Sequence, residues 1–213
     1  MEMLKIEPLI AYNNIDVSEK IIILDTNVIL DFLEKRDKDV ADFIRKLSVL
    51  NKRQLITLGT TIYNISEVLD KELEIKFQLE LLKNRNSPDT IIRKVRNRRM
   101  YSVEINKLGE DSIRKLFGSI NKNLQKALSN FVIFWLQEFT VEDYKILEDL
   151  IIRGYLQSQD ALMVLTVFKL GAYLLSKDGY LLESPIVNNL VFIYDPSNHE
   201  QRRELLKEIG VEI

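Results

Sequence analysis

The feature that most constrains the fold is a short apolar run near the start of the chain, Lys20–Leu24 (KIIIL), which ends abruptly in Asp25–Asn27 (DTN). A continuous run rich in β-branched residues is typical of a strand buried on both faces in a parallel sheet. After the polar turn, apolar residues recur at helical spacing through Val28–Leu33. This part of the chain is therefore predicted to form strand, turn and helix.

The rest of the chain repeats this alternation. Further strands are expected at residues 54–58, 131–139, 172–176 and 190–194, and helices at residues 40–50, 62–82, 140–154 and 158–171. Thr60 or Thr61 can cap the helix that follows the second strand, and Thr140 looks like the start of a capped helix. Short strands alternating with helices imply βαβ units and right-handed crossovers, and so an α/β fold with a parallel sheet.

Composition excludes several chemistries. The 213 residues include no cysteine and one histidine, His199, which lies in a polar segment. A thiolate nucleophile, a cysteine-based zinc or iron–sulfur site and a pair of catalytic histidines are therefore ruled out. The length suits one domain over residues 1–213, and the sequence has neither an export signal nor an apolar stretch of the ~20 residues that span a membrane. We expect a soluble, cytoplasmic protein.

Charge is segregated along the chain, although the net charge is only −2. The segment Lys83–Lys126 holds twelve basic and four acidic residues. Residues 84–130 are therefore predicted to form a basic insertion of two or three short helices, framed by a breaker at residues 84–88 and by Gly109 and Gly118. Such a segment suits binding of a polyanion, and a solvated helix face explains it equally well.

Four carboxylates are predicted to converge at one edge of the sheet. Asp25 and Asp178 directly follow strands, and Glu67 and Asp160 lie near the starts of helices. Because carboxylates repel one another unless a cation neutralises them, a site for Mg²⁺ or Mn²⁺ is expected here. Taken singly, each residue also has a structural explanation as a helix cap, a first-turn charge or a turn residue.

These residues resemble the motifs of PIN-domain nucleases. The resemblance is carried by Ile21–Phe32 (IIILDTNVILDF), by Glu67 within TTIYNISEVL, by Asp160 within SQDALMVLTVFKLGA, and by Ser176-Lys-Asp178 ahead of GYLL. It covers Lys20 to about Leu82 and Phe131 to Tyr194. It implies a three-layer α/β/α sandwich around a central, mainly parallel sheet.

The resemblance also implies a function, that of a metal-dependent endoribonuclease. Asp25, Glu67, Asp160 and Asp178 would hold one or two Mg²⁺ or Mn²⁺ ions, supported by Thr26, Asn27 and Ser176. Asn27 would orient Asp25, and Ser176 would support Asp178. Bound metal would activate water for in-line attack on an RNA phosphodiester. The protein would be a toxin with an antitoxin-type inhibitor or an RNA-processing factor, and a homodimer is a further expectation.

Within the basic segment, one run is the candidate RNA-binding arm. Its cationic residues and one aromatic residue are Arg93, Lys94, Arg96, Arg98, Arg99 and Tyr101. The cations could neutralise phosphates, and the tyrosine could stack on an unpaired base. A solubilising helical pair or a surface for a protein partner is the alternative.

Three other functions are alternatives to the nuclease. A catalytically weak PIN scaffold that binds RNA or a protein is the main alternative. A phosphatase of the haloacid-dehalogenase type, with Asp25 as nucleophile, would need a second acid where Asn27 stands. Nucleotide-binding loops are disfavoured, because the seven glycines form neither G-x-G-x-x-G nor a G-K-[ST] loop.

Overall fold

The computed structural model describes residues 20–83, 89–90, 107, 109–129, 131–136 and 138–211. The chain divides into two compact units, Met1–Ile65 with Leu128–Ile213, and Ser66–Ala127. The elements are β1 (Ile21–Leu24), α1 (Thr26–Glu34), α2 (Lys38–Lys52), β2 (Thr57–Thr61), α3 (Ile62–Lys83), α6 (Glu110–Leu128), β3 (Val132–Phe134), α7 (Val141–Ile152), α8 (Ser158–Leu170), β4 (Tyr173–Leu175), α9 (Gly179–Glu183), α10 (Pro185–Leu190), β5 (Phe192–Tyr194) and α11 (His199–Glu208).

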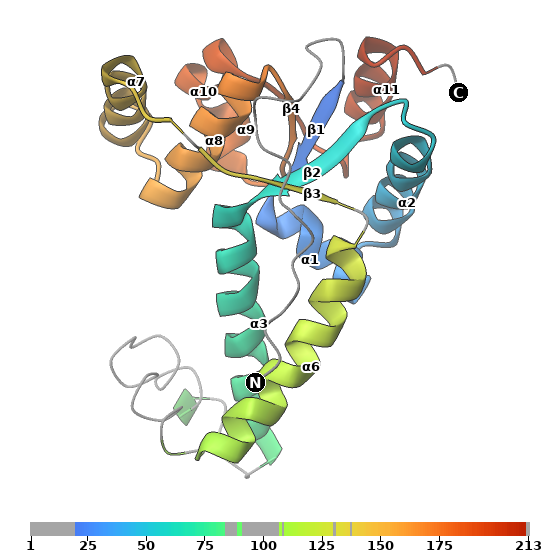
Figure 1. Ribbon diagram of the computed structural model, residues 1–213, viewed down its shortest axis with the longest axis vertical. Helices are drawn as coiled ribbons and strands as arrows, with labels where there is room; N and C mark the ends of the chain where they lie inside the picture. Colours follow the sequence, from blue (N-terminus) through green and yellow to red (C-terminus); the bar gives the residue numbers. More distant parts are fainter. Residues whose placement is uncertain are drawn as a thin grey trace. The chain divides into compact units, whose positions relative to one another are not determined.

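A five-stranded sheet in the order β3-β2-β1-β4-β5 forms the centre of the first unit (Figure 1). All four strand pairs are parallel, and Ile22 of β1 aligns with Leu58 of β2 and Tyr173 of β4. From β1 the chain builds β2 and β3 on one side, and later β4 and β5 on the other. The point between β1 and β4 is therefore a topological switch point, and ligands of open α/β sheets bind outside the carboxyl ends of the strands at such points.

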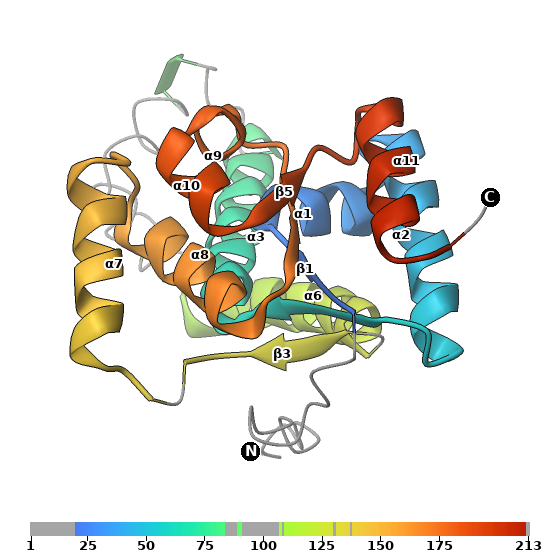
Figure 2. The same cartoon turned by 90° about the horizontal axis from the view of Figure 1, so that it is seen from above.

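Helices cover both faces of this sheet, so the first unit is a three-layer α/β/α structure. Seen from above, α1, α2 and α11 lie on one side of the strands, and α7, α8, α9 and α10 lie on the other (Figure 2). The predicted α/β class with a central parallel sheet is confirmed by this arrangement.

The central strand β1 explains why both layers are needed. Its four residues are at most 4% exposed. Ile21 and Ile23 belong to a buried cluster with residues of α7, α8 and α10, whereas Ile22 and Leu24 alternate to the opposite face. Burial on both faces accounts for the continuous apolar run in the sequence.

Close packing between β2 and β3 depends on Gly59. A Cβ atom there would lie 2.5 Å from the carbonyl oxygen of Val132 and would collide with the ring of Phe134. The ring of Phe134 is 2% exposed. A side chain at position 59 would therefore push β3 away from the sheet, which explains a glycine within a strand.

Local signals predicted the helix starts better than the strand limits. Thr140 caps α7 in a capping box with Asp143, as predicted. The second strand was expected at residues 54–58 and lies at Thr57–Thr61, because Gln54, at φ 58°, still belongs to the turn after α2. The third strand was expected over residues 131–139 and comprises only Val132–Phe134.

The second unit contains most of α3 and α6. The prediction of short helices bounded by Gly118 is wrong, because α6 runs for 19 residues through this glycine. A single glycine inside a helix costs only about 1 kcal/mol, which neighbouring helical residues can offset. Arg114, Lys115 and Lys122 are exposed on α6. The predicted RNA-binding run from Arg93 to Tyr101 lies outside the described residues.

Within the part of the chain that the structure describes, no helix combines the length and apolar character of a membrane span.

Candidate active site at the carboxyl edge of the sheet

Asp25 directly follows β1 and begins α1 as its N-cap. Its backbone N–H donates to the carbonyl oxygen of Leu175 over 2.9 Å, which extends the pairing of β1 with β4. Its Oδ1 accepts from the N–H of Thr26 (2.6 Å) and from Nδ2 of Asn64 (3.0 Å), and its Oδ2 accepts from the hydroxyl of Ser176 (2.6 Å). Asp25 is only 3% exposed. Three donors around one buried side chain suit an ionised carboxylate, which can only accept.

Ser176 connects the ends of the two central strands. It follows β4 and is fully buried, and its N–H donates to the carbonyl oxygen of Tyr194 over 3.1 Å. Its hydroxyl donates to Asp25 and accepts from the N–H of Asp178 (3.0 Å). One hydroxyl group therefore contacts both residues that the sequence placed at the carboxyl ends of strands.

Asn64 supplies a contact that the sequence analysis missed. This residue lies in the first turn of α3 and is 3% exposed. The hydroxyl of Thr61 accepts from the N–H of Asn64 (3.2 Å) and donates to its side-chain oxygen. With the oxygen held in this way, Nδ2 faces Asp25, the hydroxyl of Thr26 (3.3 Å) and the sulfur of Met163 (3.0 Å). The only signal in the sequence is the Thr-x-x-Asn spacing at a helix start, where Thr61, one of two predicted caps, caps α3.

Asn64, and not Asn27, makes the side-chain contact with Asp25. Asn27 is exposed, and the side-chain amide that bonds to Asp25 belongs to Asn64. Asn27 is the second residue of α1, and its side chain points to solvent from there. Thr26 contributes through its backbone N–H, and its buried hydroxyl accepts from Asn64.

Asp178 and Asp160 each lie at the start of a helix at this edge. Asp178 is half-buried and caps α9, with Oδ1 accepting from the N–H of Tyr180 (2.8 Å). Asp160 is half-buried in the first turn of α8, a helix that lacks a side-chain N-cap hydrogen bond. Met163, one turn further on, contacts Asn64. Because residues three apart share a helix face, Asp160 lies on the face of α8 that meets Asn64.

Glu67 is the remaining predicted carboxylate. It is half-buried on α3, three residues after Asn64 and hence on the same helix face. It falls in the second unit, whereas the other three carboxylates belong to the first.

A lysine between the two site residues Ser176 and Asp178 was also missed. The ammonium of Lys177 contacts Asp31 of α1 (2.7 Å) and Asp37 (3.2 Å), the N-cap of α2. Burial disfavours the charged lysine, but hydrogen bonds to both carboxylates outweigh burial and raise its pKa. The pKa of Asp37 is lowered, first by the N–H of Val40 and further by Lys177. These ion pairs fasten the loop after β4 to α1 and α2.

A divalent ion fits this edge by donor chemistry. The groups are carboxylates, a hydroxyl and an amide, the oxygen donors that Mg²⁺ and Mn²⁺ prefer. A carboxylate has about four lone-pair positions, so hydrogen bonds and an ion can share one group. Among the described residues, however, no group of three or more Asp, Glu, His or Cys side chains is arranged to hold a metal ion.

No family model matches the chain. No curated protein matches it either. One similar solved structure is VapBC2 from Rickettsia felis bound to a DNA fragment from their promoter, with a TM-score of 0.47 and 12% sequence identity. The match covers 82% of this chain and 98% of that chain.

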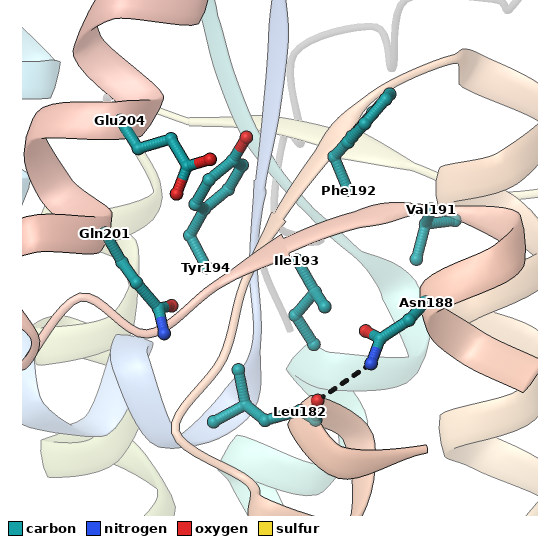
Figure 3. A pocket seen from close by; sticks show the side chains of 8 residues that line it. All are labelled: Leu182, Asn188, Val191, Phe192, Ile193, Tyr194, Gln201 and Glu204. Atoms are coloured by element: carbon teal, nitrogen blue, oxygen red, sulfur yellow. Dashed lines mark hydrogen bonds between the residues drawn. The ribbon is translucent and has the colours of Figure 1, made fainter. Parts of the chain in front are cut away.

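A separate cavity of about 340 Å³ lies at the β5 side of the first unit (Figure 3). It is lined by Leu182, Asn188, Val191, Phe192, Ile193, Tyr194, Gln201 and Glu204. Tyr194 of β5 lies beside Glu204 of α11 in this view, and Asn188 donates to the carbonyl oxygen of Leu182 (3.0 Å). Burial, followed by the charges of Glu204 and Glu208, raises the pKa of Tyr194 to about 12. None of the eight lining residues was predicted to take part in a site.

Proposed function

We propose that this chain is a metal-dependent endoribonuclease with a PIN-like fold. The observation that carries the proposal is the buried Asp25 at the switch point of the sheet, whose Oδ2 accepts from Ser176. The same serine hydroxyl accepts from the N–H of Asp178. A buried carboxylate oriented by several donors, at the place where α/β sheets bind ligands, is typical of a functional group.

Asp25, Asp160 and Asp178 would hold Mg²⁺ or Mn²⁺. The resemblance to PIN-domain nucleases implies Glu67 as a further ligand. When bound, the ion would activate water and stabilise charge on the phosphoryl and leaving oxygens. The chain offers no cysteine and a single histidine, His199. The carboxylates are thus the candidate groups for this chemistry.

Ser176 and Asn64 are positioning residues in this proposal. They act on different oxygens of Asp25, Ser176 on Oδ2 and Asn64 on Oδ1. Fixing both oxygens restricts rotation of the carboxylate before a ligand binds. Such restriction lowers the entropy cost of binding, as expected for a preorganised site.

The basic run is proposed to bind the RNA substrate. Replacement of Arg96, Arg98 and Arg99 by alanine should weaken RNA binding and reduce its salt dependence, because fewer counterions are released on binding. Replacement of Arg114, Lys115 and Lys122 by alanine, which removes three cations exposed on α6, is the matched control for lost positive charge. Unchanged binding of the Arg96, Arg98 and Arg99 variant at all salt concentrations would contradict this role.

The nuclease is tested by incubating the purified chain with single-stranded and structured RNA in Mg²⁺, Mn²⁺ or EDTA. We expect cleavage that EDTA abolishes and that Asp25→Asn abolishes without loss of the folded state. Asp195→Asn is the matched control, because Asp195 follows β5 as Asp25 follows β1. Cleavage that persists in EDTA or in Asp25→Asn would contradict the proposal.

A second candidate is a scaffold that binds RNA or a protein without cutting. It requires no metal ion and rests on the basic run that the sequence places at residues 93–101. Salt-sensitive RNA binding without cleavage in either metal, unchanged by Asp25→Asn, would support it.

The biological setting is a proposal from the sequence resemblance. The protein would act in the cytoplasm, as an RNA-processing nuclease or as a toxin held inactive by an antitoxin-type protein, and it would form a homodimer. Sedimentation of the purified chain tests the dimer. Growth arrest on expression, relieved by Asp25→Asn, would favour the toxin role.

A further inference from the structure

Two tyrosines are almost fully exposed to solvent. Tyr155 is 88% exposed and Tyr180 is 84% exposed. Each directly follows a glycine, Gly154 or Gly179, and nothing lies within 4 Å of where a Cβ of Gly179 would be. Full exposure of an aromatic ring forfeits the burial that usually stabilises it in a fold. Packing within the protein therefore does not explain these two rings.

Both tyrosines belong to the carboxyl edge of the sheet. The N–H of Tyr180 donates to Asp178, the residue that caps α9. Helix α8 leads directly into β4 through Gly171 and Ala172, so α8 runs against the strand direction and begins at the carboxyl edge. Tyr155 lies in the loop that enters α8, five residues before Asp160. Each tyrosine is thus close in sequence to one predicted metal ligand, Tyr180 to Asp178 and Tyr155 to Asp160.

The backbone at Tyr155 is strained. Its φ is +54°, in the left-handed region that a bulky residue rarely adopts. The turn is fixed on both sides, because Gly154 donates to the carbonyl oxygen of Asp149 (3.1 Å) and Leu156 donates to that of Leu150 (3.2 Å). Glycine or asparagine usually occupies this position after a helix. Lys35 and Gln54 share this conformation, and Tyr155 differs from them in combining it with a bulky ring that is 88% exposed.

We propose that Tyr155 and Tyr180 stack on unpaired bases of single-stranded RNA beside the acidic site. This inference rests on the proposed nuclease function and assigns two residues of this chain to substrate binding. Exposed aromatic faces bind bases of any sequence, but only where the bases are not already stacked in a duplex. The side chain of Arg153, two residues before Tyr155, is 71% exposed, pairs with Asp149 at 3.3 Å and can contact a phosphate.

The test measures binding of a fluorescent single-stranded oligouridine and of an RNA duplex to the full chain by anisotropy, in EDTA to prevent cleavage. Tyr155→Ala and Tyr180→Ala should each weaken single-strand binding by about 5- to 150-fold, the range of stacking on one aromatic residue. Duplex binding should be unchanged, and Tyr155→Phe should bind like the unmodified chain. Tyr144→Ala is the matched control. Tyr144 is 57% exposed and follows Asp143, which pairs with Lys169 at the end of α8 opposite Asp160.

Tyr155→Gly gives a second readout. Glycine relieves the backbone strain, so the variant should melt at a higher temperature while it binds single strands as weakly as Tyr155→Ala. A merely structural tyrosine would not combine higher stability with weaker binding.

Unchanged single-strand binding by both alanine variants would overturn the inference. Equal weakening for the duplex, or an unmodified chain that does not bind oligouridine, would also overturn it. The cleavage assay separates this inference from the nuclease proposal. Metal-dependent cleavage with unchanged binding by the tyrosine variants would remove the stacking role alone, and lost binding without any cleavage would remove the nuclease alone.

Discussion

The hydroxyl of Ser176 donates to Oδ2 of Asp25 over 2.6 Å, although the two residues are 151 positions apart in the chain. The bond joins the residues that directly follow β1 and β4, which pair in parallel at the centre of the sheet. Both residues are buried, at 0% and 3% exposed. The orientation of Asp25 therefore depends on the pairing of these two strands.

Removal of this hydroxyl tests its importance. Ser176→Ala should lower the free energy of unfolding by about 1–3 kcal/mol, because buried acceptor and donor groups lose their partner. RNA cleavage should fall as well, since Asp25 is less restricted. Denaturant unfolding and cleavage rates are the measurements. The matched control is Ser197→Ala, an exposed serine that also bonds to an aspartate, Asp195. Equal stability of the two variants would show that the buried bond adds nothing.

Asn64→Asp tests whether Asn64 orients Asp25. The change puts a second carboxylate where an amide now donates to Asp25 over 3.0 Å. Repulsion should raise the pKa of one of the two carboxyl groups above its value in the unfolded chain. The variant should therefore lose stability as the pH rises through this raised pKa and regain it as the pH falls.

Thermal unfolding over a range of pH measures this effect. Asn27→Asp is the control, because this substitution adds a carboxylate at an exposed position two residues from Asp25. The control should unfold with the pH dependence of the unmodified chain. A larger effect at position 27 than at position 64 would restore the role first predicted for Asn27.

Lys177→Met tests the ion pairs that fasten the loop after β4. The free energy of unfolding of the variant should be lower by about 1–3 kcal/mol. This is less than the 3–5 kcal/mol typical of breaking a fully buried pair, because the lysine side chain is 28% exposed. Since the pKa of Lys177 is raised from 10.5, its stabilising effect is present below that pH and is lost as the pH rises through the raised pKa. The difference between variant and unmodified chain should therefore shrink in strong alkali.

Arg45→Met is the control for Lys177→Met. Arg45 pairs with Asp42 on the surface, with the two side chains 48% and 47% exposed. Exposed pairs contribute at most about 1 kcal/mol. Urea unfolding of both variants gives the comparison, and equal losses would indicate that Lys177 has no special role.

The pKa of Tyr194 should lie well above that of ordinary tyrosines. Burial is the largest cause, and the charges of Glu204 and Glu208 add to it, so that the pKa lies at about 12 rather than 10.0. The unfolded chain then ionises first, and the contribution of Tyr194 to stability is present below pH 10 and is lost as the pH rises through its folded-state pKa.

Absorbance titration of the phenol groups measures this pKa. Tyr194→Phe should remove the component that titrates last and make unfolding less sensitive to alkali. Tyr144→Phe, on the exposed surface, should leave that component in place. A last component that survives in Tyr194→Phe would assign the high pKa to another tyrosine.

Much of the fold was predictable from local patterns. The run Ile21–Leu24 is a two-sided buried strand, and Asp25 follows it as expected. Thr140 formed the predicted capping box, because a cap depends on residues three positions apart. The second strand was misplaced by about three residues, since its limits depend on pairing with Ile21–Ile23, which the sequence of residues 54–61 does not encode alone.

The candidate site, like the fold, was predictable from the sequence only in part. The sequence by itself determined that Asp25 follows the first strand and that Asp178 follows the strand expected at residues 172–176, because each depends on neighbouring residues. Only the tertiary structure decided that Asn64 rather than Asn27 contacts Asp25 and that Lys177 pairs with Asp31. The physical reason is that these bonds join residues 39 and 146 positions apart, whose meeting requires the order of strands and the packing of helices on the sheet.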